Sequence, residues 1–278
     1  MLQETQNSNA FLEAIAPLVR ADPDGMQFIG SVASQDSTDR WLVTDAAGAA
    51  IACAVVSDRT AVLSSTTTPA DATAIGIAIA TKLATAIIEA QGPPSSVPAF
   101  LDGYASVRPD VTVVSRHRLL LYVLDPARLP TDRCTVPGEL HVATTTDKPI
   151  LTDLLTAFFR GIWGEAPATL DADIDVQVAQ RELYLWKVDG HAVACAGHSP
   201  PVTTLDGPRY RIRSVFTPES NRRRGYAAAL TAGICKALLA EAPCHISLFA
   251  ESANVASNKT YQRIGFVVKG EISTVIIA

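Results

Sequence analysis

The sequence is poor in charged residues and contains no long uninterrupted apolar run. Asp, Glu, Lys and Arg make up 18% of its 278 residues, whereas an average globular domain has about a quarter. Because 48% of the residues are apolar, disorder along the whole chain is excluded. The longest apolar stretch, around residues 72–90, contains Lys82 and Glu89 and is too interrupted to span a membrane.

Signals for secretion and for polyanionic partners are also missing. Met1–Asn9 has no basic residue ahead of an apolar run, so we expect a cytoplasmic protein that does not bind a membrane. The formal net charge is −5, which argues against a surface shaped for nucleic acid. Nothing in the composition predicts the oligomeric state.

Pairs of cysteines and clusters of histidines are absent as well. The five cysteines are odd in number and never form a C-x-x-C pair, so we expect small core residues rather than disulfides or zinc ligands. They are Cys53, Cys134, Cys195, Cys235 and Cys244. His141, His191 and His198 lack ligand spacing, and we therefore expect no metal.

What the sequence does contain is an internal similarity. Residues 42–54 and 186–196 both read as two short strands joined by a turn with Asp and Gly. Thr68-Pro69 precedes Gly76 by the same spacing at which Thr217-Pro218 precedes Gly225. Each half then closes with two expected strands, at 111–114 and 119–124 and at 266–268 and 272–277. The three similarities occur in the same order, which indicates a duplication with a longer loop within 197–210.

Proline and glycine cluster between the two halves. Pro126, Pro130, Pro137 and Gly138 are typical of a linker, and we predict domains at residues 1–132 and 138–278. The net charge divides unevenly: residues 1–135 carry 9 basic and 14 acidic side chains, and residues 136–278 carry 14 of each. Six arginines between Arg209 and Arg224 form the one strong cationic cluster of the chain.

These arginines flank a predicted strand, turn and helix. A strand at 210–217 should end at Pro218, and apolar residues at 230, 234 and 238 lie on one face of a helix. The amides that begin such a helix bind phosphate well, especially beside Gly225 and charged arginines. Two alternatives to a phosphate site are a solvated loop and salt-sensitive nucleic-acid binding through Arg209–Arg224.

Two motifs resemble the acyl-CoA-binding motifs of the GNAT superfamily of acetyltransferases. The first is Arg222-Arg223-Arg224-Gly225-Tyr226-Ala227 after Val215-Phe216-Thr217-Pro218, and the second runs from Asn254 to Phe266 as N-x-x-S-N-x-x-Y-x-x-x-G-F. The resemblance covers 215–266 directly and extends loosely from Leu140 onward. The first half resembles a degenerate copy, as in tandem GNAT proteins: residues 70–75 stand at its equivalent turn without arginines, so we expect it not to bind CoA.

The resemblance implies an α/β (α+β) fold with two GNAT-like domains, each a mixed twisted sheet flanked by helices. It also implies acetyl-CoA as co-substrate, with its pantetheine arm along the strand edge at Val215 and Thr217. The amides of Arg222, Arg223, Arg224, Gly225, Tyr226 and Ala227 would hold the pyrophosphate. Asn254 and Ser257 would contact the CoA, and Tyr261 would lie near the thioester sulfur.

Transfer to an amine requires a proton donor for the departing thiolate and a proton acceptor for the amine. The phenol of Tyr261 suits the first role because it is protonated at neutral pH. Glu251 is the nearest candidate base after the strand expected at 245–249; a chain of waters or deprotonation in bulk solvent are alternatives. Trp163 and Trp186 are candidate acceptor contacts, with Arg160 and Glu165 supplying polarity from the helix expected at 150–163, although tryptophan most often packs in a core.

These patterns predict an enzyme, an N-acetyltransferase that moves an acetyl group from acetyl-CoA directly to a primary amine of a small molecule or peptide. The alternative is a sensor or assembly protein that binds acyl-CoA without turnover. The acceptor and the preferred acyl length are not readable from the CoA motifs.

Overall fold

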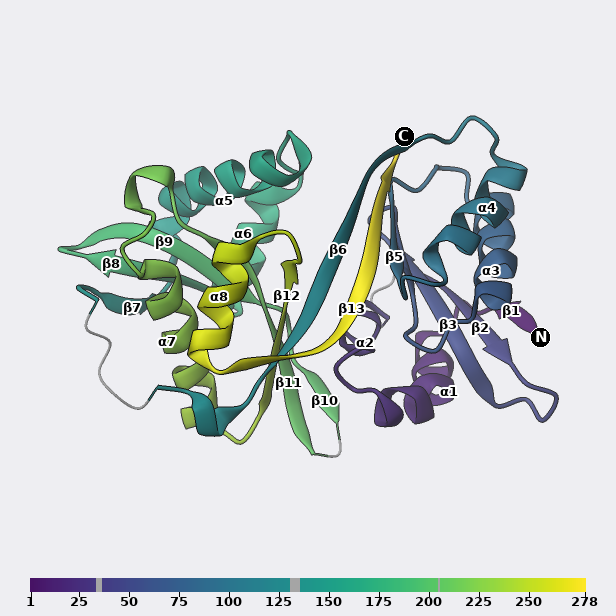
Figure 1. Cartoon of the computed structure of the whole chain (residues 1–278), viewed down its shortest axis with the longest axis horizontal. Helices are drawn as coiled ribbons and strands as arrows, with labels where there is room; N and C mark the ends of the chain where they lie inside the picture. Colours follow the sequence, from purple (N-terminus) through teal and green to yellow (C-terminus); the bar gives the residue numbers. More distant parts are fainter. Residues whose placement is uncertain (34–36, 131–135, 205) are drawn as a thin grey trace. The chain divides into compact units, whose positions relative to one another are not determined.

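The computed structural model describes residues 1–33, 37–130, 136–204 and 206–278 (Figure 1), with the side chain of Trp163 also left out of the description. Contacts group these residues into two compact units. The first contains Met1–Leu121, Ala250–Asn254 and Val268–Ala278, and the second contains Tyr122–Phe249 and Val255–Val267. The second unit therefore lies within the sequence span of the first.

The first unit is a mixed sheet covered by helices on both faces. Its strands follow the order β1-β2-β3-β4-β5-β13-β6. Strands β4 and β5 pair in parallel, whereas β1–β2, β2–β3, β3–β4 and β5–β13 pair antiparallel. The elements are β1 (Leu2–Glu4), α1 (Ser8–Ala21), α2 (Gln27–Val32), β2 (Asp39–Thr44), β3 (Ala50–Ser57), β4 (Thr60–Leu63), α3 (Pro69–Lys82), β5 (Glu89–Gly92), α4 (Val97–Val107), β6 (Val113–Leu124) and β13 (Phe266–Ile277).

Alternation along the strands builds two cores, one on each face of this sheet. Trp41 and Val43 of β2 pack with α3 and α4, whereas Leu42 between them packs with α1 and α2. Val275 of β13 belongs to the first of these cores, because β13 pairs antiparallel with β5. The last described strand of the chain thus completes the core of the first unit.

The second unit is also a mixed sheet, with the order β7-β8-β9-β11-β12 and β10 paired to β11. Strands β11 and β12 pair in parallel, whereas β7–β8, β8–β9, β9–β11 and β10–β11 pair antiparallel. The elements are β7 (Glu139–Val142), α5 (Lys148–Trp163), α6 (Leu170–Ala179), β8 (Leu183–Val188), β9 (His191–His198), β10 (Val202–Thr204), β11 (Gly207–Phe216), α7 (Tyr226–Glu241), β12 (His245–Glu251) and α8 (Val255–Ile264), with short 3-10 turns at Pro126–Arg128, Thr145–Asp147 and Glu219–Asn221.

The expected hairpins are confirmed, and the closing strands are longer than expected. Residues 42–54 and 186–196 form β2–β3 and β8–β9. Each pair of short strands expected at the end of a half is one continuous strand, β6 or β13. Polar residues such as Arg118 and Glu271, which form an ion pair, occupy exposed or half-exposed positions in these strands and do not interrupt them. The longer loop expected within 197–210 includes the short strand β10.

The second similarity between the halves is not a structural equivalence at its glycine. Helix α7 begins just after Gly225, whereas α3 begins at Pro69 and carries Gly76 in its interior. A Cβ on Gly76 would lie 2.2 Å from the carbonyl oxygen of Phe100 in α4. Gly76 therefore permits two helices to pack closely, and residues 70–75, expected as a turn, are helical.

The two compact units do not follow the predicted domains 1–132 and 138–278, because residues 250–254 and 268–278 group with the first unit. Four cysteines, at 53, 195, 235 and 244, are free and buried as expected, and Cys134 lies outside the described residues.

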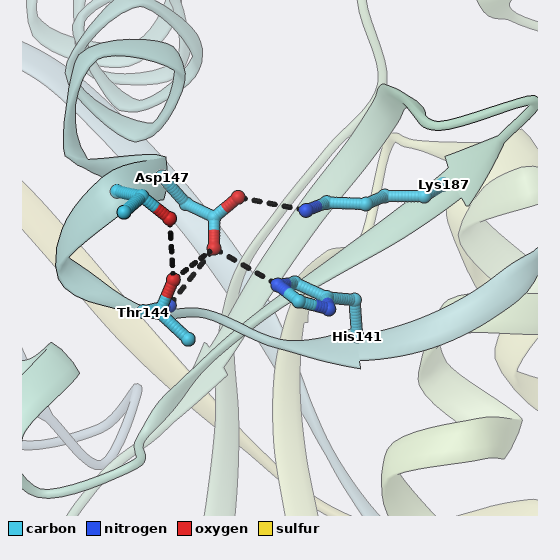
Figure 2. Close-up of polar contacts among 5 residues, drawn as sticks. His141, Thr144, Asp147 and Lys187 are labelled. Atoms are coloured by element: carbon cyan, nitrogen blue, oxygen red, sulfur yellow. Dashed lines mark hydrogen bonds and ion pairs between the residues drawn. The ribbon is translucent and has the colours of Figure 1, made fainter.

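A buried carboxylate fixes the start of α5 to two strands. Figure 2 shows Asp147 accepting hydrogen bonds from the amide and hydroxyl of Thr144 at 2.9 and 2.8 Å, with Lys187 Nζ of β8 at 2.7 Å and His141 Nε2 of β7 at 2.9 Å. Burial alone would raise the pKa of Asp147, but the hydrogen bonds from Lys187, Thr144 and His141 outweigh it and hold the pKa well below its usual range.

We expect Asp147→Asn to lower the free energy of unfolding at pH 7 by about 2 kcal/mol, because the charged hydrogen bonds are lost. The native pKa lies below the unfolded value of about 4, so this contribution is present above pH ~4 and disappears as the pH falls through the native pKa. Urea unfolding at pH 7 and at acid pH measures both effects. Asp153→Asn, at an exposed position of α5, is the control, and an equal loss in the two variants would contradict the assignment.

Candidate functional site

Strands β11 and β12 part midway along their length. Their parallel pairing runs from Arg209 opposite His245 to Ile212 opposite Leu248 and goes no further, although both strands continue. On its other side β11 has a bulge: three steps from Arg213 to Phe216 match two steps of β9, and Ser214 takes a φ of 53°. A bulge leaves backbone groups unpaired, so the end of β11 offers hydrogen-bonding groups where β12 no longer pairs with it.

A tight turn carries the chain from the end of β11 into α7. Arg223 and Gly225 both have left-handed backbone conformations, with φ of 61° and 84°. Gly225 is the N-cap of α7 and provides no side-chain cap. The first amides of the helix therefore keep no intrahelical acceptor and point from the positive end of the helix dipole.

The side chains around this turn favour an anion. Arg222, Arg223 and Arg224 are exposed, and Arg222 Nε donates to the carbonyl of Thr217 at 3.1 Å, which braces the turn. The hydroxyl of Thr217 is buried without a hydrogen-bond partner in the described part of the chain. An unpaired buried hydroxyl is unfavourable. A polar ligand group beside the end of β11 would give it a hydrogen-bond partner.

The first amides of helix α3, in the first half, are satisfied within the chain. Thr68 accepts a hydrogen bond from the amide of Asp71 at 3.2 Å, and the carboxylate of Asp71 reaches back to the amide of Thr68 at 3.4 Å. This capping box satisfies the amides at the start of α3 and places a negative charge there. The expectation that the first half does not bind CoA therefore has a physical basis beyond its missing arginines.

Helix α8 holds Tyr261 in a buried aromatic cluster. The ring of Tyr261 lies 6.2 Å from that of Tyr122 and 6.1 Å from that of Phe266. The hydroxyl of Tyr122 donates to Asn258 Oδ1 at 3.2 Å, which ties α8 to the end of β6. Tyr261 is 8% exposed, and burial raises its pKa to about 12. Its phenol is therefore protonated over the whole physiological range.

Glu251 has a partner that the sequence did not reveal. His117 Nδ1 lies 3.2 Å from Glu251 Oε2, and His117 Nε2 lies 2.9 Å from the hydroxyl of Ser115. All three residues belong to the first unit, and the imidazole and carboxylate side chains remain 43% and 34% exposed. In the sequence, only the contact between Ser115 and His117 had a signal, because residues two apart on one strand point to the same face.

The candidate acceptor residues fall into two groups. Arg160 and Glu165 are exposed at the end of α5, which stops at Gly164 with a φ of 81°. Phe158 of the same helix packs edge-on against Phe216 of β11, with ring centroids 6.2 Å apart, so this end of α5 lies beside the end of β11. Trp186 is 5% exposed and its indole N–H donates to the carbonyl of Pro137 at 2.9 Å, which is a packing role.

Comparison with known proteins finds a family match within the second half. Residues 148–266 match the model of the acetyltransferase (GNAT) family, and these residues contain both motifs and the parted strands. These residues are therefore similar to a GNAT acetyltransferase domain. A search among curated proteins found no match.

Solved structures similar to the whole chain show the same fold. A Drosophila protein aligns with a TM-score of 0.71 at 10% identity, over 99% of this chain and 98% of its own. A GCN5-related N-acetyltransferase from Sphaerobacter thermophilus gives 0.64 at 16%, over 100% and 95%. A tandem GNAT protein from the clavulanic acid biosynthesis pathway gives 0.58 at 11%, over 100% and 98%. The likeness extends through both halves, as expected for a tandem fold.

Two expected absences concern only the described residues. These residues contain no group of three or more His, Cys, Asp or Glu side chains placed to hold a metal ion. No helix among them is long and apolar enough to cross a membrane.

The turn depends on the conformation of Gly225, and we expect Gly225→Ala to lower the free energy of unfolding by about 1–2 kcal/mol. The substitution strains a left-handed residue, and its Cβ would lie 2.9 Å from Val136 Cγ2. Gly161→Ala is the matched control, because Gly161 lies in α5 with nothing within 4 Å, and it should increase stability by about 0.5–1 kcal/mol. Chemical denaturation compares them; an unchanged Gly225→Ala protein would contradict the strain argument.

Proposed function

We propose that the protein is an N-acetyltransferase that transfers the acetyl group of acetyl-CoA to a primary amine of a small molecule or peptide. The observation that carries the proposal is the cationic turn at the start of α7, directly after a bulged strand that has parted from its neighbour. A turn of this kind holds phosphates, and the parted strands leave backbone groups for a polar arm.

The residues of the second half fit coenzyme A. The amides of Arg222 to Ala227 and the guanidinium groups of the three arginines would hold the pyrophosphate, and Val215 and Thr217 would bond the pantetheine amides through the edge of β11. Asn254 and Ser257, at the start of α8, would contact the same arm. Acetyl-CoA would supply the activated thioester, and the protein's own groups would position it and move protons.

Tyr261 would act as the acid. In the transfer the amine nitrogen bonds to the carbonyl carbon, the carbon–sulfur bond breaks, and the sulfur needs a proton. A phenol whose pKa is raised to about 12 by burial keeps its proton at neutral pH and donates it to the departing thiolate. Its ring is fixed by Tyr122 and Phe266, and its hydroxyl makes no hydrogen bond to another described residue.

Glu251 would act as the base together with His117. An imidazole oriented by a carboxylate on one nitrogen accepts a proton on the other, and Glu251 lies on Nδ1 while the hydroxyl of Ser115 lies on Nε2. The amine proton would pass to His117, directly or through Ser115. For the acceptor we retain Arg160, Trp163 and Glu165 at the end of α5 and do not use Trp186.

Removing the Tyr261 hydroxyl should lower turnover far more than CoA affinity. We expect Tyr261→Phe to reduce kcat about 100-fold, while the Kd for CoA stays within twofold, because the ring and its packing are kept. Thiol release from acetyl-CoA with a panel of amines measures turnover, and calorimetry measures Kd. Unchanged turnover would remove Tyr261 as the acid. CoA binding without thiol release for any amine would favour the non-catalytic sensor or assembly protein.

The base should appear in the pH dependence. A base must be deprotonated, so kcat/KM should fall as the pH is lowered. We expect Glu251→Gln to lower kcat/KM about tenfold and to alter the acidic limb, because the proposed base loses its carboxylate. His117→Gln should lower kcat/KM as well. Glu271→Gln, which removes the nearby partner of Arg118, is the control. An acidic limb that is the same in wild type and Glu251→Gln would remove Glu251.

A further inference from the structure

Strand β11 carries two arginines that the proposed contacts to coenzyme A do not use. Arg211 and Arg213 are two residues apart on the regular part of the strand, so their side chains project from the same face of the sheet. The register places Arg213 opposite Gly197 of β9, and Gly197 opposite Leu183 of β8. Leu183 packs in the core formed with α5 and α6. Both arginines therefore lie on the α5–α6 face of the second unit.

Arg213 is held in place from two sides. Its Nε donates to the carbonyl of His198 at 3.2 Å, and its Nη2 lies 3.5 Å from Glu182 Oε2. The side chain of Glu182 is 5% exposed, whereas that of Arg213 is 30% exposed. A guanidinium has five N–H groups, and these two contacts use only some of them. Arg213 is therefore fixed in orientation and still accessible to a ligand.

The surroundings of the two arginines disfavour their positive charge. Burial lowers the pKa of Arg213, although the carboxylates of Glu182 and of the exposed Asp173 favour its charged form. Burial and the like charge of Arg213 together lower the pKa of Arg211 to about 10. An anion beside the pair would relieve this repulsion, and it would form charge-assisted hydrogen bonds with a guanidinium that is already oriented.

The arginines lie at the end of the path proposed for the acyl donor. That path begins at the turn before α7 and passes Thr217 and then Val215, so it runs back along β11 toward the end of the ladder with β12. The last paired residue of β11 is Ile212, and Arg213 follows it. Arg213 is two residues from Val215, about 7 Å along an extended strand. The thioester end of the donor would therefore come close to Arg213, on the side from which an acceptor attacks.

We propose that Arg213, together with Arg211, binds a carboxylate of the acceptor, so that the acceptor is an amino acid or another amine with a carboxylate near its amino group. This inference rests on the proposed function and narrows its acceptor class. A carboxylate can accept two parallel N–H bonds from one guanidinium. Because Glu182 already balances one of the two arginines, a monoanion restores neutrality, whereas a phosphate dianion would leave an excess of negative charge.

Matched pairs of acceptors test this inference: α- and ω-amino acids, each with its carboxamide. We expect the full chain to acetylate the acids with a kcat/KM about tenfold or more above that of the amides, measured by thiol release from acetyl-CoA. The amide of an α-amino acid has the less basic amino group, which by itself would make it the better nucleophile at neutral pH. A preference for the acids therefore cannot come from the basicity of the amine.

Variants of Arg213 separate binding of the carboxylate from a structural role. Arg213→Gln should remove the preference by raising KM for the acids about tenfold or more, with KM for the amides unchanged. Arg213→Gln/Glu182→Gln removes both charges, so no buried carboxylate is left without its cation, and it should lose the preference equally. Arg181→Gln, which removes an exposed charge between α6 and β8, should keep the preference. Circular dichroism checks that each variant folds.

Equal kcat/KM values for acids and amides would overturn the inference and leave the proposed function in place. A preference for acids that persists in both Arg213 variants would also overturn it, as would a stronger preference for aminoalkyl phosphates than for amino acids. A loss of activity that is the same for acids and amides in the variants would indicate a structural role for Arg213 and contradict the inference. If no amine of either kind supports thiol release, the proposed function fails, and the inference fails with it.

Discussion

The candidate site depends on where two parallel strands stop pairing. Paired strands satisfy each other's backbone N–H and C=O groups. A sheet whose strands are paired along their whole length would therefore leave no backbone group for a ligand. Here the ladder between β11 and β12 ends at Ile212 and Leu248, and the bulge at Ser214 also interrupts the pairing with β9. The loss of ladder hydrogen bonds is local, and the buried cores on the sheet faces offset it. The turn, its arginines and α7 come directly after this end of β11 in the chain.

The two halves of the chain differ in how the first amides of a helix are satisfied. In α7 the cap position is a glycine with no side-chain acceptor, so the amides remain available and arginines surround them. In α3 the same kind of amide is already bonded to Thr68, and Asp71 repels any approaching anion. The amides at the start of α7 are left without a side-chain acceptor, whereas those at the start of α3 are satisfied by Thr68 and Asp71. The difference between the two helix starts comes from their capping residues and not from the sheet architecture of the two halves.

The sequence predicted those features that depend on neighbours along the chain. The hairpins, α7, and the order of strand, turn and helix follow from alternation, apolar spacing and glycine, and all are confirmed. The sequence did not predict those features that depend on contacts between distant parts of the chain. Gly76 looked like a turn residue because its role, the close approach of α4, leaves no local trace. His117 is 134 positions from Glu251, and no periodicity links them. The contact between Arg213 and Glu182 needed β8, β9 and β11 placed side by side.

The course of β13 has a consequence for how the protein is made. Ser273 to Ile276 pair with β5, and Val275 and Ile277 belong to a core that otherwise comes from residues before 105. During synthesis the amino-terminal half emerges first and would ordinarily fold first. Here the position of β13 beside β5 stays empty until residues 268–278 have left the ribosome. By then the whole second unit has already been translated. The part of the chain that is synthesised first is therefore completed last, and its unpaired strand edge needs protection from other chains in the interval.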